Sequence, residues 1–203
     1  LQIDAGKIYG YSPQEVLDTQ QSLYEKKLTT YPRSDCDYLP TNQLADVPLI
    51  LKSLRALTDN LAQMVEHADP SLRSRAWNDK KISAHHAIIP TTITPEWDKL
   101  TEKEQNLYTL VAKAYLAQFY QPQTFLSTRI QIRCAGEFFH ASGKVILDDG
   151  WKQLYHGALE DKEGEDHPEI KLPAVKQGDA VSFQESRIQT RTTKPPARYN
   201  AST

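Results

Sequence analysis

The segment TEKEQNLYTLVAKAYLAQFYQPQTFLSTRIQIR, residues 101–133, sets the fold class, because the spacing of its hydrophobic residues changes part-way along it. Thr101 and Glu104 have the spacing of a capping box, and the apolar residues behind them recur at helical intervals as far as Pro122. This proline ends the helix, and over residues 126–133 apolar and polar side chains alternate as in a half-buried strand. A helical part therefore precedes a β-rich part, which predicts an α+β fold.

Two more helices are expected on the N-terminal side of this segment. Residues 12–15, Ser-Pro-Gln-Glu, form a second capping box with proline at the first helical position, which predicts a helix over 12–27. An apolar stripe at helical spacing predicts one helix over 48–67, and an Asp-Pro dipeptide ends it. The polar and basic residues 71–83 that follow are typical of an exposed loop.

Short strands are expected to continue the β-rich part. Residues 135–137, Ala-Gly-Glu, predict a turn after the first strand. Apolar and β-branched runs then predict strands over 145–147, 180–183 and 187–190. These patterns divide the chain into three parts: a helical domain over 1–121, a β-rich segment over 122–194, and residues 195–203, which either start a further segment or are only the end of this piece.

The composition excludes several classes of protein. The chain has 203 residues, of which 39% are hydrophobic and 25% charged, as in ordinary globular domains. No apolar run approaches the ~20 residues of a membrane span, and the first residues resemble neither a signal nor a transit peptide. Because the chain starts at Leu1 without a methionine, we expect it to be a piece of a longer protein. Cys36 and Cys134 are far apart, which excludes a zinc ribbon and favours a reducing, cytoplasmic location.

Charge is unevenly distributed along the chain. The 24 basic and 26 acidic residues give a net charge of −2, which by itself argues weakly against a nucleic-acid partner. Residues 158–170 hold six acids and one base, so the rest of the chain carries +3, and residues 186–203 hold four bases and no acid. This segregation fits a local basic face, and it fits equally well an acidic loop and a basic tail that are simply solvated.

Tyr31 is a candidate nucleophile in the segment Thr-Thr-Tyr-Pro-Arg, residues 29–33. Pro32 disfavours helical geometry for the residue before it, so Tyr31 is expected on an extended segment. A tyrosine hydroxyl can attack phosphorus reversibly, and Arg33 can bind the phosphate oxygens in a forked pair. Spacing alone also permits the plainer interpretation, because most of the ten tyrosines should be packing residues.

Two further groups could bind phosphate or metal. Adjacent residues cannot both project the same way from a regular element, so His85 and His86 are a poor metal-chelating pair. One of them could contact phosphate, although an ordinary packed histidine is the plainer interpretation. Asp35-Cys36-Asp37 could hold Mg²⁺, but it is more typical of a turn. The nucleotide-binding, hydrolase and zinc-protease motifs are missing, which argues against ATP use, dinucleotide chemistry and zinc hydrolysis.

Several motifs together resemble one known family. LTTYPRSD at 28–35 resembles the active-site tyrosine motif of type IA DNA topoisomerases, and its Tyr-Pro-Arg form resembles the bacterial topoisomerase III branch. SAHHAIIPT at 83–91 resembles the second motif of the family. F-x-A-S-G at 139–143, Gly-Trp at 150–151 and KPPARY at 194–199 resemble later segments. The order of these motifs extends the resemblance over essentially the whole chain.

The resemblance implies a role for four residues. By position, Tyr31 matches the nucleophile that forms a 5′-phosphotyrosine link to a cut single strand, and Arg33 matches the arginine that assists cleavage. His85 matches the histidine that contacts the DNA backbone, and Arg198 matches an arginine close to the bound strand. The implied activity is cleavage, strand passage and religation, which relaxes or decatenates DNA. Residues 200–203, Asn-Ala-Ser-Thr, depart from the family pattern of Thr/Ser-Glu-Ala.

The resemblance also implies which parts of the enzyme lie outside this chain. The family's Toprim domain binds Mg²⁺ and supplies a catalytic glutamate and lysine, and no counterpart is found in these 203 residues. The chain is then expected to bind no cofactor itself, to be inactive alone, and to work with single-stranded DNA and the other domains of its parent, without a membrane.

Two other functions remain open on the sequence. One is a non-catalytic module that binds single-stranded nucleic acid and uses Tyr31 only to stack on bases. The other is a structural or protein-interaction domain, which predicts no preference for single-stranded over duplex DNA. Replacing Tyr31 by phenylalanine separates the first from an enzyme, because stacking survives loss of the hydroxyl and a covalent adduct does not.

Overall fold

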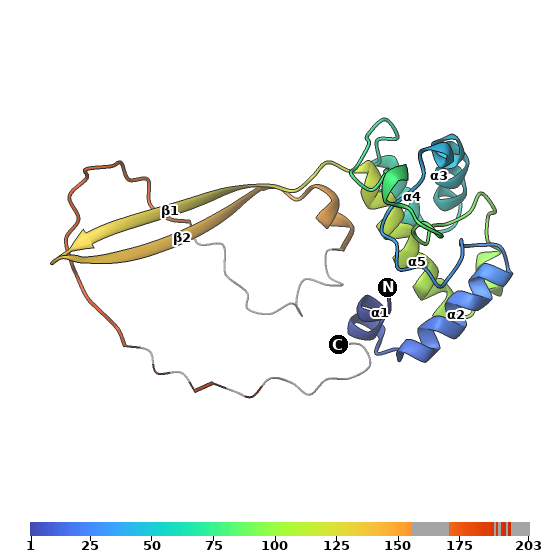
Figure 1. Cartoon of the computed structure of the whole chain (residues 1–203), viewed down its shortest axis with the longest axis horizontal. Helices are drawn as coiled ribbons and strands as arrows, with labels where there is room; N and C mark the ends of the chain where they lie inside the picture. The colour runs from blue at the N-terminus through green and yellow to red at the C-terminus, as the bar shows by residue number, and fades with distance from the viewer. Residues whose placement is uncertain (156–170, 189, 191, 194, 196–203) are drawn as a thin grey trace.

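A two-stranded hairpin extends away from a body of helices in the computed structural model (Figure 1). The structure describes residues 1–155, 171–188, 190, 192, 193 and 195. Helices and an antiparallel pair of strands occupy separate stretches of the chain, so the predicted α+β class is confirmed. Arg198 and the acidic residues 158–170 lie outside the described residues.

In the described part of the chain, five α-helices build the helical body, and 3₁₀ helices lie in the connections, after α5 and after the hairpin. The two predicted capping boxes are confirmed: the hydroxyls of Ser12 and Thr101 each accept from the backbone N–H three residues later, and Glu15 and Glu104 reach back to the capping residue. The α-helices are α1 (Gln2–Tyr9), α2 (Pro13–Glu25), α3 (Val47–Arg55), α4 (Asp59–Glu66) and α5 (Glu102–Leu116). The 3₁₀ helices are Thr41–Asp46, Asp79–Lys81, Trp97–Lys99, Ala117–Phe119 and Gly150–Tyr155.

The prediction of one helix over 48–67 is wrong, because two helices, α3 and α4, fill this range. Thr58 has extended backbone angles, and its hydroxyl accepts from the backbone N–H of Leu61 at 3.2 Å, which starts a new helix. The apolar stripe nevertheless continues across the break, since Leu54 and Leu61 are both buried in the same core. No helix in the described part of the chain is both long enough and apolar enough to cross a membrane.

Helix α5 forms the centre of the helical body (Figure 1). Its Leu107, Tyr108 and Tyr115 side chains are almost completely buried, and it packs along α2. At the N-terminal end of α5 the Glu104 carboxylate accepts from Lys26 at 2.6 Å and from the Ser22 hydroxyl at 2.7 Å. This carboxylate therefore ties the first turn of α5 to the last turn of α2.

The hairpin pairs β1 (Thr124–Cys134) with β2 (Glu137–Asp148) in antiparallel register. Ala135 and Gly136 join them, and both have positive φ, 50° and 90°, which matches the two-residue turn that suits twisted strands. The predicted turn and the predicted change of period after Pro122 are both confirmed.

The two faces of the hairpin differ in chemistry because side chains alternate along each strand. The register pairs Ser127 with Lys144, Arg129 with Ser142, Gln131 with His140 and Arg133 with Phe138 on one face. That face carries three cations and no acidic side chain. The opposite face is mostly apolar; its hydrophobic members are Leu126, Ile130, Ile132, Phe139, Ala141 and Val145.

The strands predicted at 180–183 and 187–190 are not found. Residues 171–188 and 190 contain no strand, and Gln189 lies outside the described residues. A strand exists only through hydrogen bonds to a neighbour, and within the described ranges nothing pairs with this stretch. Phe183 is accordingly 74% exposed and Ile188 96% exposed.

Candidate active site

Two segments far apart in the sequence lie antiparallel and carry the candidate site. The backbone N–H of Thr30 donates to the Ile89 carbonyl and that of Thr91 donates to the Leu28 carbonyl, each at 3.0 Å. An isolated antiparallel bridge joins Thr29 and Pro90 between these bonds. This pairing brings the Tyr31 loop beside the segment that holds the two histidines.

Helix α2 packs against the segment that carries Tyr31. Thr29 is almost completely buried, and its hydroxyl accepts a 2.7 Å hydrogen bond from the Gln20 amide on α2. The neighbouring Thr30 hydroxyl accepts from the Ile89 N–H at 3.0 Å and donates to the Ala87 carbonyl at 3.3 Å. The two threonines thus fix the backbone immediately before Tyr31 on both sides.

Tyr31 lies in an aromatic cluster with its hydroxyl unengaged. Its ring stacks on the His85 ring with centroids 4.3 Å apart and an angle of 28° between the planes. The Tyr24 ring of α2 meets Tyr31 edge-on at 5.7 Å. Tyr31 is half-buried and His85 exposed, and within the described residues no hydrogen bond engages the Tyr31 hydroxyl. The cluster fixes the ring and leaves the oxygen available.

Arg33 follows on the same loop and is exposed. Tyr31, Pro32 and Arg33 lie outside any helix, as Pro32 predicts. Among the residues that the structure describes, no hydrogen bond or ion pair holds the Arg33 guanidinium. All its donors are therefore available to an incoming anion such as phosphate.

The turn expected at Asp35-Cys36-Asp37 is not found as a backbone turn, and local hydrogen bonds of side chains hold this loop instead. The Ser34 hydroxyl accepts from the Cys36 N–H at 3.2 Å, and the Cys36 sulfur accepts from the Tyr38 N–H at 3.4 Å. Both aspartates are exposed. In the described part of the chain no group of three or more His, Cys, Asp or Glu side chains could hold a metal ion, so these residues do not fit a Mg²⁺ site.

The two histidines point in different directions, as their adjacency predicted. His85 stacks on Tyr31, whereas the His86 ring contacts the Ala87 carbonyl through Nδ1 at 2.7 Å and the Gln43 amide nitrogen through Nε2 at 3.0 Å. They therefore do not share a metal ion or a single phosphate oxygen.

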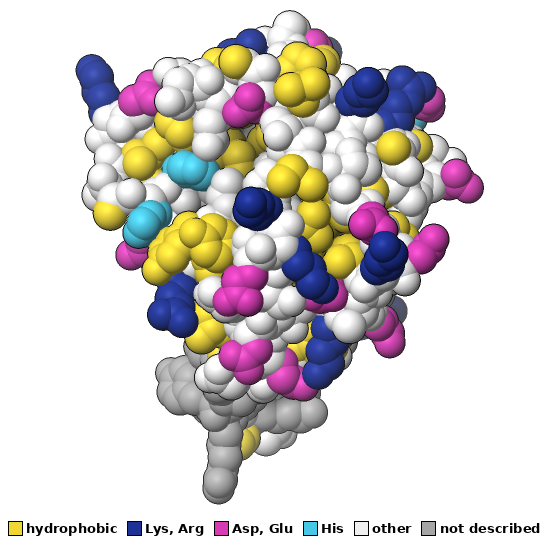
Figure 2. Space-filling model, turned by 90° about the vertical axis from the view of Figure 1, so that its right-hand side faces the viewer, with side chains coloured by type: hydrophobic (Ala, Val, Ile, Leu, Met, Phe, Trp, Pro, Cys, Tyr) yellow, Lys and Arg dark blue, Asp and Glu magenta, His cyan; other side chains and the backbone are white. Residues whose placement is uncertain are grey.

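The basic loop 71–83 is anchored beside the tyrosine loop. The Asp79 carboxylate accepts from the backbone N–H of Thr41 at 2.9 Å and from its hydroxyl at 2.6 Å, and these bonds lower the pKa of Asp79. The Lys81 ammonium donates to the Tyr38 hydroxyl at 2.9 Å and lies over the Tyr38 ring. Figure 2 shows basic and acidic side chains interspersed over the end of the helical body that faces away from the hairpin.

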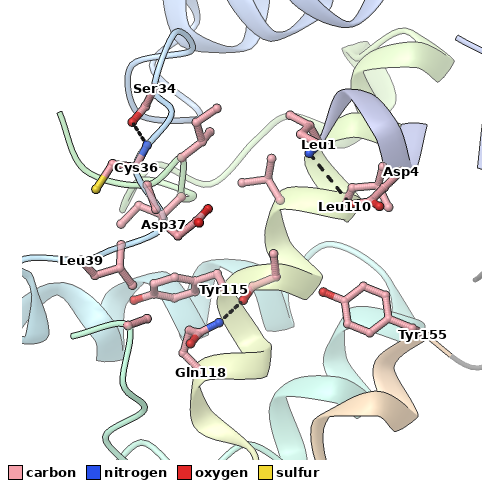
Figure 3. A pocket seen from close by; sticks show the side chains of 16 residues that line it. Leu1, Asp4, Ser34, Cys36, Asp37, Leu39, Leu110, Tyr115, Gln118 and Tyr155 are labelled. Carbon is pink, nitrogen blue, oxygen red and sulfur yellow. Dashed lines mark hydrogen bonds and ion pairs between the residues drawn. The ribbon is translucent and has the colours of Figure 1, made fainter. Parts of the chain in front are cut away.

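A cavity of about 340 Å³ lies behind the two site segments. Figure 3 shows Ser34, Cys36 and Asp37 of the tyrosine loop on one side of it and Leu1 and Asp4 of the N-terminal region on the other. The floor comes from α5, and the Tyr155 ring closes the far side. Burial, and then the nearby Asp4 carboxylate, raise the pKa of Tyr155 to about 12.

Comparison with known proteins identifies the family. A family model described as DNA topoisomerase matches residues 1–203, the whole chain. This chain belongs to the type IA DNA topoisomerases. The topoisomerase 3 of Vibrio cholerae is 42% identical over all of this chain and 31% of its own length, and the topoisomerase 3 of Bacillus subtilis is 36% identical over all of this chain and 28% of its own. The chain thus spans about a third of these topoisomerase relatives.

A solved topoisomerase structure shares the fold. Full-length topoisomerase I from Thermotoga maritima superposes with a TM-score of 0.51 at 22% identity, over 76% of this chain and 25% of that protein. The family resemblance stated from the sequence motifs is therefore confirmed, and its topoisomerase III branch agrees with the names of the bacterial relatives.

The structure thus brings Tyr31 and His85 into contact, with Arg33 on the same loop, while Arg198 lies outside the described residues. Sequence reasoning missed Tyr24 and Gln43. Gln43 and His86 are 43 positions apart, so their contact depends on how distant segments pack. Tyr24 and Tyr31 are close in sequence, and their ring contact depends on how the chain turns after α2.

Proposed function

We propose that this chain carries the nucleophile of a type IA topoisomerase that cuts and rejoins single-stranded DNA. The observation that carries the proposal is the stacked pair of Tyr31 and His85, with the tyrosine hydroxyl unengaged and the exposed Arg33 two residues away. A nucleophile needs a fixed position and an accessible reacting atom, and this cluster supplies both.

The proposed step exchanges one phosphodiester bond for another. The Tyr31 oxygen attacks the scissile phosphorus, the bond from phosphorus to the 3′ oxygen breaks, and the tyrosine proton ends on that 3′ oxygen. The 5′ end of the cut strand is then held as phosphotyrosine, and the reverse reaction reseals it without an external energy source. Arg33 would pair with the non-bridging oxygens and His85 would contact the adjacent backbone.

We propose that the chain provides a helical tyrosine domain over 1–121 and a gate-arm segment over 122–194, with 195–203 starting a further segment. The remaining domains of the parent protein would include the Toprim domain, which would bind Mg²⁺. Strand passage for relaxation or decatenation would need this whole assembly. The two free cysteines fit action on DNA in the reducing cytoplasm.

The basic face of the hairpin supports a DNA partner. Arg129, Arg133 and Lys144 share that face with no acidic neighbour. Lys144 lies 4.4 Å from the centre of the Phe125 ring and Arg133 lies 6.0 Å from that of Phe138. Cations beside exposed aromatic rings suit contacts to phosphates and unstacked bases.

The same features also favour the second function, a non-catalytic module for single-stranded nucleic acid. The half-exposed Tyr24 and the hairpin aromatics could stack on bases without any chemistry. The Tyr31→Phe substitution separates the two functions. The intact parent protein carrying it is mixed with Mg²⁺ and a labelled oligonucleotide, and strand affinity and adduct formation are measured. A nucleophilic Tyr31 predicts normal strand affinity and complete loss of the detergent-stable adduct, whereas an adduct that survives this change would refute its assignment.

A further inference from the structure

We propose that His86 is a positioning residue that holds His85 against Tyr31 through a fixed contact with Gln43. The inference rests on the function proposed above, in which the Tyr31 and His85 pair handles the scissile phosphate. His86 itself faces away from that pair, so its role is to fix its neighbour.

Both ring nitrogens of His86 are engaged. Nδ1 lies 2.7 Å from the Ala87 carbonyl oxygen, and Nε2 lies 3.0 Å from the Gln43 amide nitrogen. A carbonyl oxygen only accepts and an amide nitrogen only donates, so Nδ1 carries the proton and Nε2 accepts. With one hydrogen bond at each edge, the half-buried ring cannot rotate without breaking one of them.

The Ala87 carbonyl joins His86 to the tyrosine segment. It accepts from His86 Nδ1 and also from the Thr30 hydroxyl, at 3.3 Å. Thr30 immediately precedes Tyr31, and Ala87 follows the two histidines. A single backbone oxygen therefore connects the residue before the nucleophile to the ring that neighbours His85.

Gln43 is anchored independently of the site. It lies on the 3₁₀ helix Thr41–Asp46, whose first residue is held by two hydrogen bonds to the Asp79 carboxylate. The Gln43 amide oxygen is buried and has no hydrogen-bond partner among the residues that the structure describes. If the Gln43 amide were flipped, its oxygen would face the lone pair of His86 Nε2, and two acceptors would meet. Gln43 therefore turns its N–H toward His86, and this orientation leaves its own oxygen unpaired.

His85 depends on this support because little else fixes its ring. It is exposed, and the Tyr31 stack is its one ring contact within the described residues, where no hydrogen bond holds the imidazole. Neighbouring side chains on an extended segment point to opposite sides. Because His86 is held on the side of Gln43, the His85 side chain must lie on the opposite side, where it contacts Tyr31.

The first test is spectroscopic and needs no enzymatic activity. The stack on Tyr31 should displace the ring-proton resonances of His85 upfield in the NMR spectrum of the chain, and Tyr31→Leu defines the unstacked position. His86→Phe keeps the ring volume and removes both hydrogen bonds, and Gln43→Met removes the donor from the other side. Both should move the His85 resonances toward the Tyr31→Leu values. His86→Asn, which keeps a donor near the Ala87 carbonyl, should restore part of the shift.

His67→Phe is the matched control, because this exposed histidine, among the described residues, bonds only the Gln63 carbonyl at the end of α4. It should leave His85 unchanged. His85 resonances that stay at their original positions in both His86→Phe and Gln43→Met would overturn the proposal, and folding of each variant is read from the rest of the spectrum.

The second test uses the intact parent protein and single-turnover cleavage of an oligonucleotide. Misplacing a phosphate-contacting group should slow cleavage in His86→Phe by on the order of tenfold or more, with strand affinity within about twofold of the original. Unchanged cleavage despite a displaced His85 would refute the positioning role. Cleavage that persists in Tyr31→Phe would instead refute the proposed function, and the two failures are thereby distinguished.

Discussion

Glu104 should give the chain a strong dependence of stability on acid pH. Its side chain is only 5% exposed at the junction of α2 and α5. Burial alone would raise its pKa, but hydrogen bonds from Lys26, Ser22 and the Thr101 backbone outweigh burial and lower the pKa from 4.5 to about 2. One pKa unit corresponds to about 1.4 kcal/mol, so the ionised carboxylate stabilises the folded state by about 3 kcal/mol at neutral pH.

The direction of the effect follows from the sign of the shift. Because the pKa in the folded chain lies below the value in the unfolded chain, the stabilisation is present in full above about pH 4.5. It disappears as the pH falls through about 2. Protonation of Glu104 should also loosen α2, which carries Gln20 and Tyr24 beneath the tyrosine segment.

The assay is urea unfolding at a series of pH values between 7 and 2.5, with Glu104→Gln compared to the original chain. The variant should be less stable at pH 7, by up to about 3 kcal/mol, and the difference should shrink as the pH falls. Glu102→Gln is the matched control, because Glu102 is an exposed acid in the same turn and makes no such buried contact. A gap between Glu104→Gln and the original chain that is constant down to pH 2.5 would show that ionisation of Glu104 is not the source of the stability.

Three further changes have defined expectations. Arg33→Lys in the intact parent should slow single-turnover cleavage by on the order of tenfold to a hundredfold, since lysine cannot make the forked pair with phosphate; an unaltered rate would remove Arg33 from the site. Neutralising Arg133 and Lys144 together should reduce the salt dependence of single-strand binding, with Ser127→Gln as the control. The slope of log binding constant against log salt concentration should fall by about 0.7 for each phosphate that is no longer neutralised, and an identical slope would show that this face does not bind DNA. Leu107→Ala, at a fully buried position of α5, should lower the free energy of unfolding by about 3 kcal/mol in urea titrations, and a decrease below about 1 kcal/mol would contradict the assigned core.

Local sequence rules predicted the elements that local interactions determine. The capping residues Ser12 and Thr101, the change of period after Pro122 and the Ala135-Gly136 turn depend on neighbours within a few positions, and each was found as expected. The missed break before α4 was also local, because Thr58 is a good capping residue three positions before Leu61. Its signature was hidden by the apolar stripe that continues across it.

The prediction of strands at 180–183 and 187–190 was wrong for a different reason. Their alternating pattern fits a strand, but a strand also needs a partner, and partner choice is a property of the whole fold. The hairpin could be predicted because its two strands are neighbours in sequence and a two-residue turn sets their register.

The candidate site was predicted in its parts and not in its assembly. Pro32 predicted the non-helical tyrosine, and the adjacency of His85 and His86 predicted that they diverge. The resemblance singled out His85 as the histidine that contacts the DNA backbone, but the stacking of its ring on Tyr31 was not predicted. The contact depends on the antiparallel pairing of two distant segments, which no local pattern encodes.

The assignment of Tyr31 as the residue that becomes linked to DNA can be tested by mapping the covalent adduct. The intact parent protein would be trapped on a labelled single-stranded oligonucleotide with Mg²⁺, the DNA trimmed, and the protein digested with trypsin. Cleavage after Lys27 and Arg33 isolates Tyr31 on the peptide LTTYPR, apart from Tyr24 and Tyr38. If Tyr31 is the nucleophile, the added nucleotide mass lies on the tyrosine of that peptide. The same mass on Tyr24, on Tyr38 or elsewhere, with LTTYPR unmodified, would contradict the assignment.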